Sequence, residues 1–556
     1  MTDASNPADA PLTEAAGGGG VGAPVAPVSA GPPAAPVSAG SPPRQVEEIR
    51  AGYAFEGAAL EFGAAVVDDQ AYPEARVRIP LGVLNRHGLI AGATGTGKTK
   101  TLQLMAEQLC AQGVPVFLAD IKGDLSGMAV PGATNDKITA RSQSIGMEWT
   151  PTAYPAEFLS LGGLGNGIPI RATITSFGPT LLSKVLGLNA TQESSLGLVF
   201  HYADQNGLAL LDLKDLRAVI QHLTSAEGKA DLKSLGGLSA ATAGVILREL
   251  TAFADRGAET FFGEPEFNTA DLLRMSGDGR GMVTILELPA VQDRPALFST
   301  FLMWMLADLF HDLPEVGDPE RPKLVFFFDE AHLLFDGASR DFLDAIQQTV
   351  RLIRSKGVGV FFVTQSPKDV PSDVLAQLGN RVQHALRAFT PDDAKALKAA
   401  ASTYPRSPYD LTTLLTSLGT GEAVITVLSE RGAPTPVAWT RMRAPQSLMA
   451  PAPEATVREI MAASQIAQKY AAVEDRESAY EKLQARLQAA PTPEQAPAPS
   501  GDTPPPAPRA RAPKEEPGMV AQVVGSSAFR SMLRSAGTVV GREITRSIFG
   551  TARRGR

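Results

Sequence analysis

The sequence contains a single cysteine, Cys110, and few aromatic residues, which make up 6% of the chain. One thiol excludes an intrachain disulfide framework and a cysteine-rich zinc site, and it suits a reducing compartment. We therefore interpret Cys110 as a small, buried apolar residue on a helix.

Long apolar runs and a secretory leader are also missing. The most apolar helical stretch, residues 298–310, is shorter than the ~20 residues that a membrane span needs, and it contains Asp308. The N-terminus shows no basic run followed by an apolar core. These features predict a soluble, cytoplasmic protein.

Charge gives little sign of a nucleic-acid-binding protein, because the formal net charge is −8. Its distribution is uneven, however. From Thr503 onward there are ten Arg or Lys against three Glu, so this tail carries +7 and the remainder −15. The asymmetry predicts a basic arm on an acidic body.

Composition and hydrophobic periodicity divide the chain into seven segments. The expected segments are a disordered Ala/Pro/Gly-rich leader (1–43), the first part of an α/β core (44–130), a mainly α-helical insertion (131–275), the second part of the core (276–450), a long helix (451–489), a Pro/Ala-rich linker (490–517) and a basic amphipathic C-terminal segment (518–556).

The core shows the alternation of a doubly wound α/β fold. A buried strand at 88–91 leads into a Gly-rich turn, a helix at 99–112 and a continuous apolar strand at 114–120. Strands resume after the insertion, at 282–288, 323–329 and 358–364, with helices between them. This order predicts a mostly parallel sheet covered by helices on both faces.

The segment GATGTGKT after the first of these strands matches the pattern G-x-x-x-x-G-K-[ST] at every position. Its glycines let successive backbone N–H groups point at phosphate oxygens, at the positive end of the following helix. Lys98 is expected to reach the β- and γ-phosphates of ATP, and the Thr99 hydroxyl to ligate Mg²⁺. The residues expected to hold the nucleotide are Gly92, Ala93, Thr94, Gly95, Thr96, Gly97, Lys98 and Thr99.

A second motif, LVFFFDEAH at 324–332, places two carboxylates at the end of an apolar strand. Ligands bind at that end of the strands in such sheets. Asp329 is expected to hold Mg²⁺, and Glu330 to polarise the attacking water. A glutamate directly after the aspartate favours ATP hydrolysis over the transfer chemistry of a small-molecule kinase.

The strand at 358–364 ends in Thr364-Gln365-Ser366. We interpret Gln365 as a sensor that contacts the γ-phosphate and the water. ATP motors also need a positive charge at the transition state, often an arginine from a neighbouring subunit. Arg351 and Arg354, which precede this strand, are candidates, as are Arg381 and Arg387 around the next one; a surface ion pair is the alternative for each.

Together these motifs resemble the HerA/FtsK superfamily of P-loop motors, and most of all the bacterial HerA-like helicase-domain proteins. The resemblance rests on GATGTGKT, a strand ending in DIKGD, FFFDEAH and a VTQSP strand, with FFGEPEF at 261–267 and a basic helix at 539–550 also expected. It implies a RecA-like P-loop core with a helical insertion, a homo-oligomeric, hexameric ring, and ATP-driven movement along double-stranded DNA.

Two other interpretations remain open from the residues alone. The chain could be an ATP-dependent switch or scaffold that acts on a protein partner without DNA. The basic C-terminal helix could contact DNA, an anionic membrane surface or a partner subunit.

Overall fold

The computed structural model describes residues 42–489 except 233–235, 337 and 339. Every described helix and strand lies between Arg44 and Ala489. The predictions for the leader, the linker and the basic C-terminal segment lie outside the described residues.

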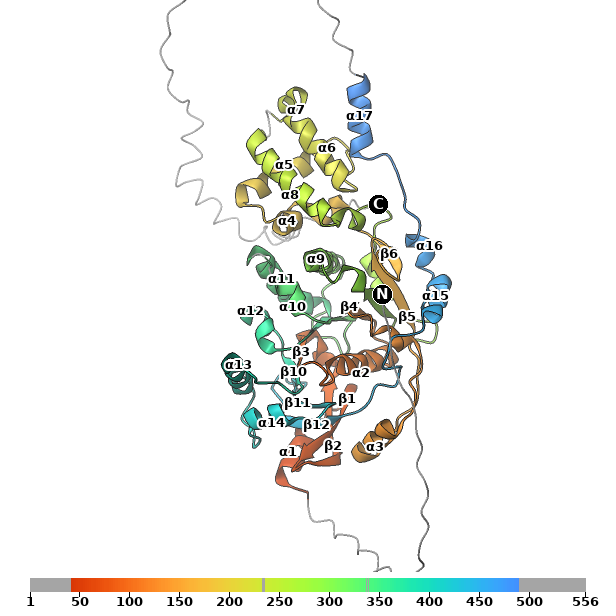
Figure 1. The fold of residues 1–556 in the computed structure, drawn as a ribbon, viewed down its shortest axis with the longest axis vertical. Helices are drawn as coiled ribbons and strands as arrows, with labels where there is room; N and C mark the ends of the chain where they lie inside the picture. Colours follow the sequence, from red (N-terminus) through yellow and green to blue (C-terminus); the bar gives the residue numbers. More distant parts are fainter. Residues whose placement is uncertain (1–41, 233–235, 337, 339, 490–556) are drawn as a thin grey trace, which may run out of the picture. The chain divides into compact units, whose positions relative to one another are not determined.

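The described residues form one mixed sheet of 12 strands in the order β2-β1-β12-β11-β10-β3-β9-β8-β4-β7-β5-β6 (Figure 1). The strands from β10 to β6 run parallel, and β11, β12, β1 and β2 extend the sheet by antiparallel pairing. Their bounds are β1 Ala59–Val67, β2 Gln70–Pro80, β3 Gly88–Ala91, β4 Val116–Asp120, β5 Ala156–Leu161, β6 Ile168–Ile170, β7 Val283–Glu287, β8 Leu324–Phe328, β9 Val358–Thr364, β10 Asn380–Gln383, β11 Glu422–Thr426 and β12 Ala438–Met442.

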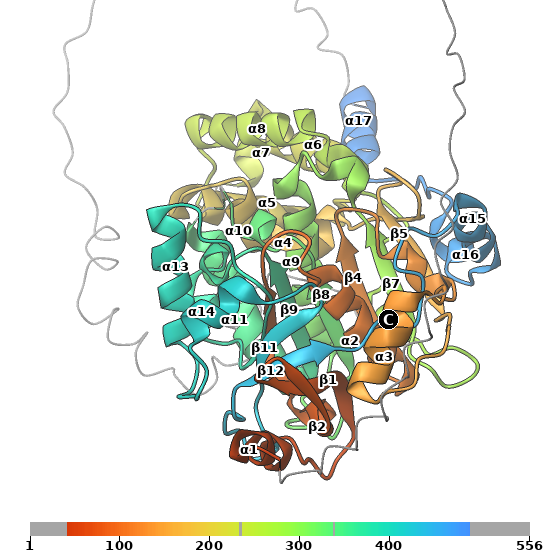
Figure 2. The same ribbon diagram turned by 60° about the horizontal axis from the view of Figure 1, so that its bottom comes forward.

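Helices cover both faces of this sheet, and several gather beyond its β5–β6 end (Figures 1 and 2). Their bounds are α1 Arg44–Gly52, α2 Lys98–Ala111, α3 Asp136–Ile145, α4 Ile174–Val185, α5 Ala190–Gln205, α6 Leu213–Thr224, α7 Ala226–Asp231, α8 Ala240–Asp255, α9 Pro295–Asp312, α10 His332–Phe335, α11 Arg340–Ile353, α12 Ser372–Leu375, α13 Pro391–Ser402, α14 Leu411–Ser417, α15 Glu454–Ala463, α16 Ala467–Tyr470 and α17 Ala479–Ala489. None of the helices in this part of the chain is long and apolar enough to cross a bilayer.

Strand β8 shows why its sequence is apolar throughout. Phe326 and Phe328 face the hydrophobic core that also includes α9 and α11, whereas Val325 and Phe327 face the second core, against α2. All five residues of β8 are buried. A strand covered on both faces has a continuous apolar sequence, which agrees with the predicted sheet covered by helices on both faces. The α/β prediction is therefore confirmed.

The structure adds two strands to the predicted mainly α-helical segment and corrects the predicted long helix. Residues 131–275 are helical in α3 and from α4 to α8, but β5 and β6 lie inside this range and β5 pairs with β7 of the core sheet. The predicted single helix at 451–489 is three helices, α15 to α17. The first ends because Ser464 adopts an extended backbone and its hydroxyl donates to Glu157 Oε2 (2.8 Å) on β5.

Candidate functional site

The turn between β3 and α2 has the backbone that its glycines were expected to provide. Gly97 precedes the first residue of α2 with φ 119°, a conformation that side-chain-bearing residues rarely adopt. A Cβ on Gly92 would lie 2.5 Å from Cβ of His384. Because α2 begins at Lys98, the turn ends at a helix N-terminus, where unpaired N–H groups and the helix dipole favour bound phosphate.

Lys98 is the first residue of α2 and is 6% exposed. Its ammonium donates to Ala93 O (3.2 Å), so the side chain folds back over the turn. Burial lowers the pKa of Lys98, and the neighbouring Lys122 adds to this, while Glu330 and Asp329 oppose it. A buried cation next to two carboxylates is thus placed where phosphate oxygens would bind.

Asp329 follows β8 and is 2% exposed. Within the described part of the chain, neither of its carboxylate oxygens has a hydrogen-bond partner. Burial, with a further contribution from the nearby Glu330 charge and against the opposing effect of Lys122, raises the pKa of Asp329 to about 7. Such a carboxylate is destabilised unless it gains a cation.

A magnesium ion fits this position. Mg²⁺ takes oxygen ligands and is usually held by one or two carboxylates together with substrate phosphates, not by a cage of protein ligands. Asp329 and Thr99, the second residue of α2, would be its protein ligands.

Glu330 has a left-handed backbone, with φ 46°, which is uncommon outside glycine. Its Oε1 forms an ion pair with Lys122 Nζ, and its Oε2 lies 3.3 Å from His332 Nδ1 without a hydrogen bond between them. Burial opposes ionisation, but the Lys122 ammonium outweighs it, so the pKa of Glu330 lies below its ordinary value. The carboxylate is therefore available as an ionised group.

The loop after β4 holds Lys122 in place. The Asp120 carboxylate accepts hydrogen bonds from the backbone N–H groups of Lys122 (3.2 Å), Gly123 (2.8 Å) and Leu125 (2.9 Å). The sequence analysis noted a strand ending in DIKGD but did not identify Lys122 as the partner of Glu330. The motif DIKGD carried the signal, since a lysine follows a strand that ends at the same edge.

His384 is a second residue that the sequence did not single out. It is fully buried beneath the phosphate-binding turn. Its Nδ1–H donates to Glu422 O (2.9 Å), so its Nε2 accepts from the Thr101 hydroxyl (2.8 Å). Burial lowers its pKa to about 4. A neutral imidazole thus joins α2 to β11 below the turn.

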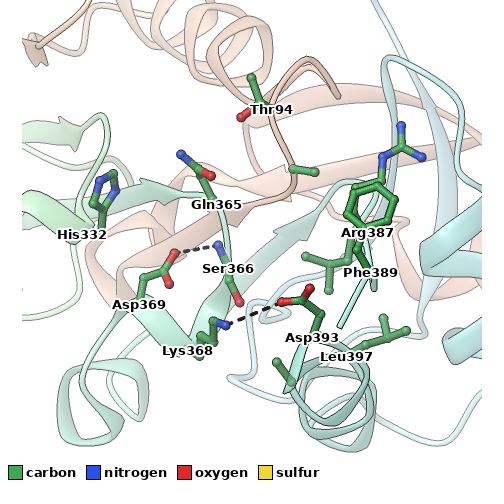
Figure 3. A pocket seen from close by; sticks show the side chains of 13 residues that line it. Thr94, His332, Gln365, Ser366, Lys368, Asp369, Arg387, Phe389, Asp393 and Leu397 are labelled. Carbon is green, nitrogen blue, oxygen red and sulfur yellow. Dashed lines mark hydrogen bonds and ion pairs between the residues drawn. The ribbon is translucent and has the colours of Figure 1, made fainter. Parts of the chain in front are cut away.

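Gln365 directly follows β9, which lies between β3 and β8 in the sheet. It lines a cavity of about 610 Å³ with Ala93 and Thr94 of the turn, and His332 lies on the same side (Figure 3). The structure thus brings Gln365 beside the phosphate-binding turn. Its sensor role stays a prediction.

Arg351 and Arg354 lie away from this cavity. Both precede the start of β9, whereas the turn follows the end of the parallel strand β3. A strand of this length separates the two edges by about 20 Å. Arg351 is exposed, and Arg354 pairs with Asp318 (3.3 Å). Neither reaches the turn of its own chain, and a role in a neighbouring subunit stays a prediction.

Comparisons with known proteins give the following matches. The family model described as "Helicase HerA-like C-terminal" matches residues 66–556. A DNA double-strand break repair helicase HerA from Sulfurisphaera tokodaii is 22% identical over 361 residues, which is 63% of this chain and 64% of that protein. The chain therefore spans somewhat less than two thirds of the length of this curated relative.

Two solved structures of one protein are also similar. The bacterial conjugative coupling protein TrwBdeltaN70 in an unbound form is 15% identical, with a TM-score of 0.48 over 74% of this chain and 94% of that chain. The plasmid coupling protein TrwB in complex with ADP and Mg²⁺ is 16% identical, with a TM-score of 0.45 over 72% of this chain and 98% of that chain.

Proposed function

The chain belongs to the HerA-like helicase C-terminal family, and from this premise we propose that it is a Mg²⁺-dependent ATP hydrolase that works as an oligomeric motor on double-stranded DNA. The observation that carries the proposal is the meeting of three groups at the carboxyl edge of the parallel strands. These are the phosphate-binding turn with Lys98, the unpartnered carboxylate of Asp329 and the ionised carboxylate of Glu330.

Each side chain has a role in this proposal. Lys98 would exchange its bond to Ala93 O for phosphate oxygens, and Glu330 would orient a water molecule for attack on the γ-phosphate. Thr99 and Asp329 would hold Mg²⁺, which neutralises charge on the phosphates when bound. Gln365, directly after β9 and between β3 and β8, would contact the γ-phosphate.

DNA as the substrate is supported by the relative whose name describes a DNA repair helicase. The basic tail from Thr503 onward carries a net charge of +7, which would favour contacts with DNA phosphates. We further propose a hexameric ring located in the cytoplasm, in which one subunit supplies an arginine to the next.

Phosphate release from ATP, measured with and without double-stranded DNA, tests the proposal. We expect wild-type turnover to rise several-fold with DNA, and Glu330→Gln to be inactive in both conditions. Glu315→Gln, which alters an exposed carboxylate on the loop after α9, is the matched control and should behave as wild type.

Slow turnover that ignores DNA would contradict the motor. It would favour the second candidate, an ATP-dependent switch or scaffold acting on a protein partner, for which the net charge of −8 is the supporting observation. Absence of inorganic phosphate from ATP alone would instead indicate a kinase.

A further inference from the structure

The cavity beside the phosphate-binding turn is lined by Ala93, Thr94 and Gln365, and otherwise by residues that have no role in the proposed chemistry. Its volume, about 610 Å³, falls within the ~300–1,000 Å³ common for small-molecule sites. One side is formed by Thr94, His332 and Gln365. The other is formed by the segment after β10 and by α13, through Arg387, Phe389 and Leu397 (Figure 3). Leu386 and Ala396 also line the cavity.

Phe389 on that second side is unusually exposed. Its exposed fraction is 86%, whereas the other exposed large apolar residues in the described part of the chain, Met275, Met449 and Val473, range from 37% to 66%. A phenylalanine ring in water forfeits the stabilisation that burial would give it. Beside the cavity, the ring has most of its surface available for an apolar contact.

Local folding does not supply one. Thr390 caps α13: its hydroxyl accepts from the Asp393 N–H (3.2 Å), and the Asp393 carboxylate accepts from the Thr390 N–H (3.1 Å). An apolar residue just before such a cap often packs on the fourth helical residue. That residue is Ala394, and Phe389 remains exposed. The cap thus fixes the backbone next to Phe389 while its ring stays free to meet a ligand.

We propose that Phe389 is the surface on which the base of the bound nucleotide stacks. The inference rests on the proposed function, since it places the phosphates at the turn and Gln365 and the base at the opposite side of the same cavity. Leu386 and Leu397 provide the apolar edge that a purine ring prefers, and aromatic rings stack on every base. Arg387 lies beside Phe389 in the cavity wall (Figure 3).

Equilibrium binding of two probes, ATP and inorganic tripolyphosphate, separates the base from the phosphates. Phe389→Ala should weaken ATP binding on the order of tenfold and leave tripolyphosphate binding within about twofold, because only ATP carries a base. Phe389→Trp should restore ATP binding. Val473→Ala, an exposed apolar residue that does not line the cavity, is the control and should change neither affinity.

The outcomes distinguish this inference from the proposed function. Suppose that the wild type binds ATP. Base stacking on Phe389 is then wrong if Phe389→Ala binds ATP equally well, or if it loses affinity for ATP and tripolyphosphate alike. Either result leaves the proposed nucleotide site in place. If Phe389→Ala keeps its ATP affinity but loses stimulation by DNA, the stacking proposal is also wrong, because the ring would then contact DNA and not the base of ATP. If the wild type binds neither probe, the proposed function fails and this inference fails with it.

Discussion

Several side chains in this protein are held in protonation states that burial imposes. His87 is an example distant from the cavity. It precedes β3 with φ 58°, it is 2% exposed, and its Nδ1 accepts from the Val360 N–H (3.0 Å). Burial lowers the pKa of His87 to about 4, so the neutral ring is the folded form.

Stability should therefore fall in mild acid. Above pH 6.5 His87 is neutral in the folded and the unfolded chain and contributes no pH dependence. Between pH 6.5 and about 4 the unfolded chain takes up a proton that the folded chain refuses, at a cost on the order of 3 kcal/mol. His87→Asn keeps an acceptor and tolerates the positive φ. We expect its thermal midpoint to fall less steeply with pH than that of the wild type.

The matched control is His201→Asn, which alters an exposed histidine on α5. It should follow the wild-type pH dependence. If the thermal midpoints of wild type and His87→Asn fall equally steeply with pH, His87 takes up its proton as readily in the folded protein as in the unfolded chain.

Among the elements, α17, the last helix of the described residues, is joined to the helical insertion. Asp215, near the start of α6 and 1% exposed, accepts from the Tyr480 N–H (2.9 Å) and from the Ser478 hydroxyl (2.5 Å) with one oxygen. Its other oxygen accepts from the N–H groups of Leu211 (2.9 Å) and Asp212 (3.2 Å). One buried carboxylate thus joins the α6 N-terminus to α17, as Figure 1 places them side by side.

Asp215→Ala should destabilise both elements by about 2–4 kcal/mol, because it leaves several buried N–H groups unpaired. Amide hydrogen exchange should speed up first in α17. Asp204→Ala, at an exposed position near the end of α5, should leave exchange unchanged. Unaltered protection of α17 in Asp215→Ala would show that other contacts hold the helix.

The elements that carry the site could be predicted from sequence, because each strand is covered on both faces and so is apolar throughout. The strand predicted at 358–364 is β9 itself, and the acids after β8 lie where the motif placed them. Contacts between distant segments could not be predicted. The Lys122–Glu330 pair, the His384 bridge and the break at Ser464 each depend on a partner that no local pattern names.

At the scale of the whole molecule, the described chain is a sheet with the phosphate-binding turn at one edge and Arg351 and Arg354 toward the other. Within one chain, Arg351 and Arg354 do not reach the phosphates of a nucleotide bound at the turn of that chain. The proposed ring would do so across a subunit boundary.

Subunit mixing tests this arrangement. If Arg354 acts in trans, Arg354→Ala and Glu330→Gln should each be inactive alone, yet a mixture should recover part of the activity, because one subunit supplies Glu330 and its neighbour supplies Arg354. Arg351→Ala should be tested in the same way. Arg458→Ala, an exposed arginine on α15, should stay active alone. If a mixture is no more active than its two components, the arginine tested does not act on the nucleotide of a neighbouring subunit.

In the proposed site, Lys98, Asp329 and Glu330 together bind and hydrolyse ATP. This can be tested by measuring, in the presence of Mg²⁺, both the ATP bound and the phosphate released by Glu330→Gln. We expect this variant to bind ATP within a few-fold of the wild type and to release phosphate at least about 100-fold more slowly, since the general base is lost. Phosphate release at the wild-type rate would show that Glu330 is not the catalytic carboxylate.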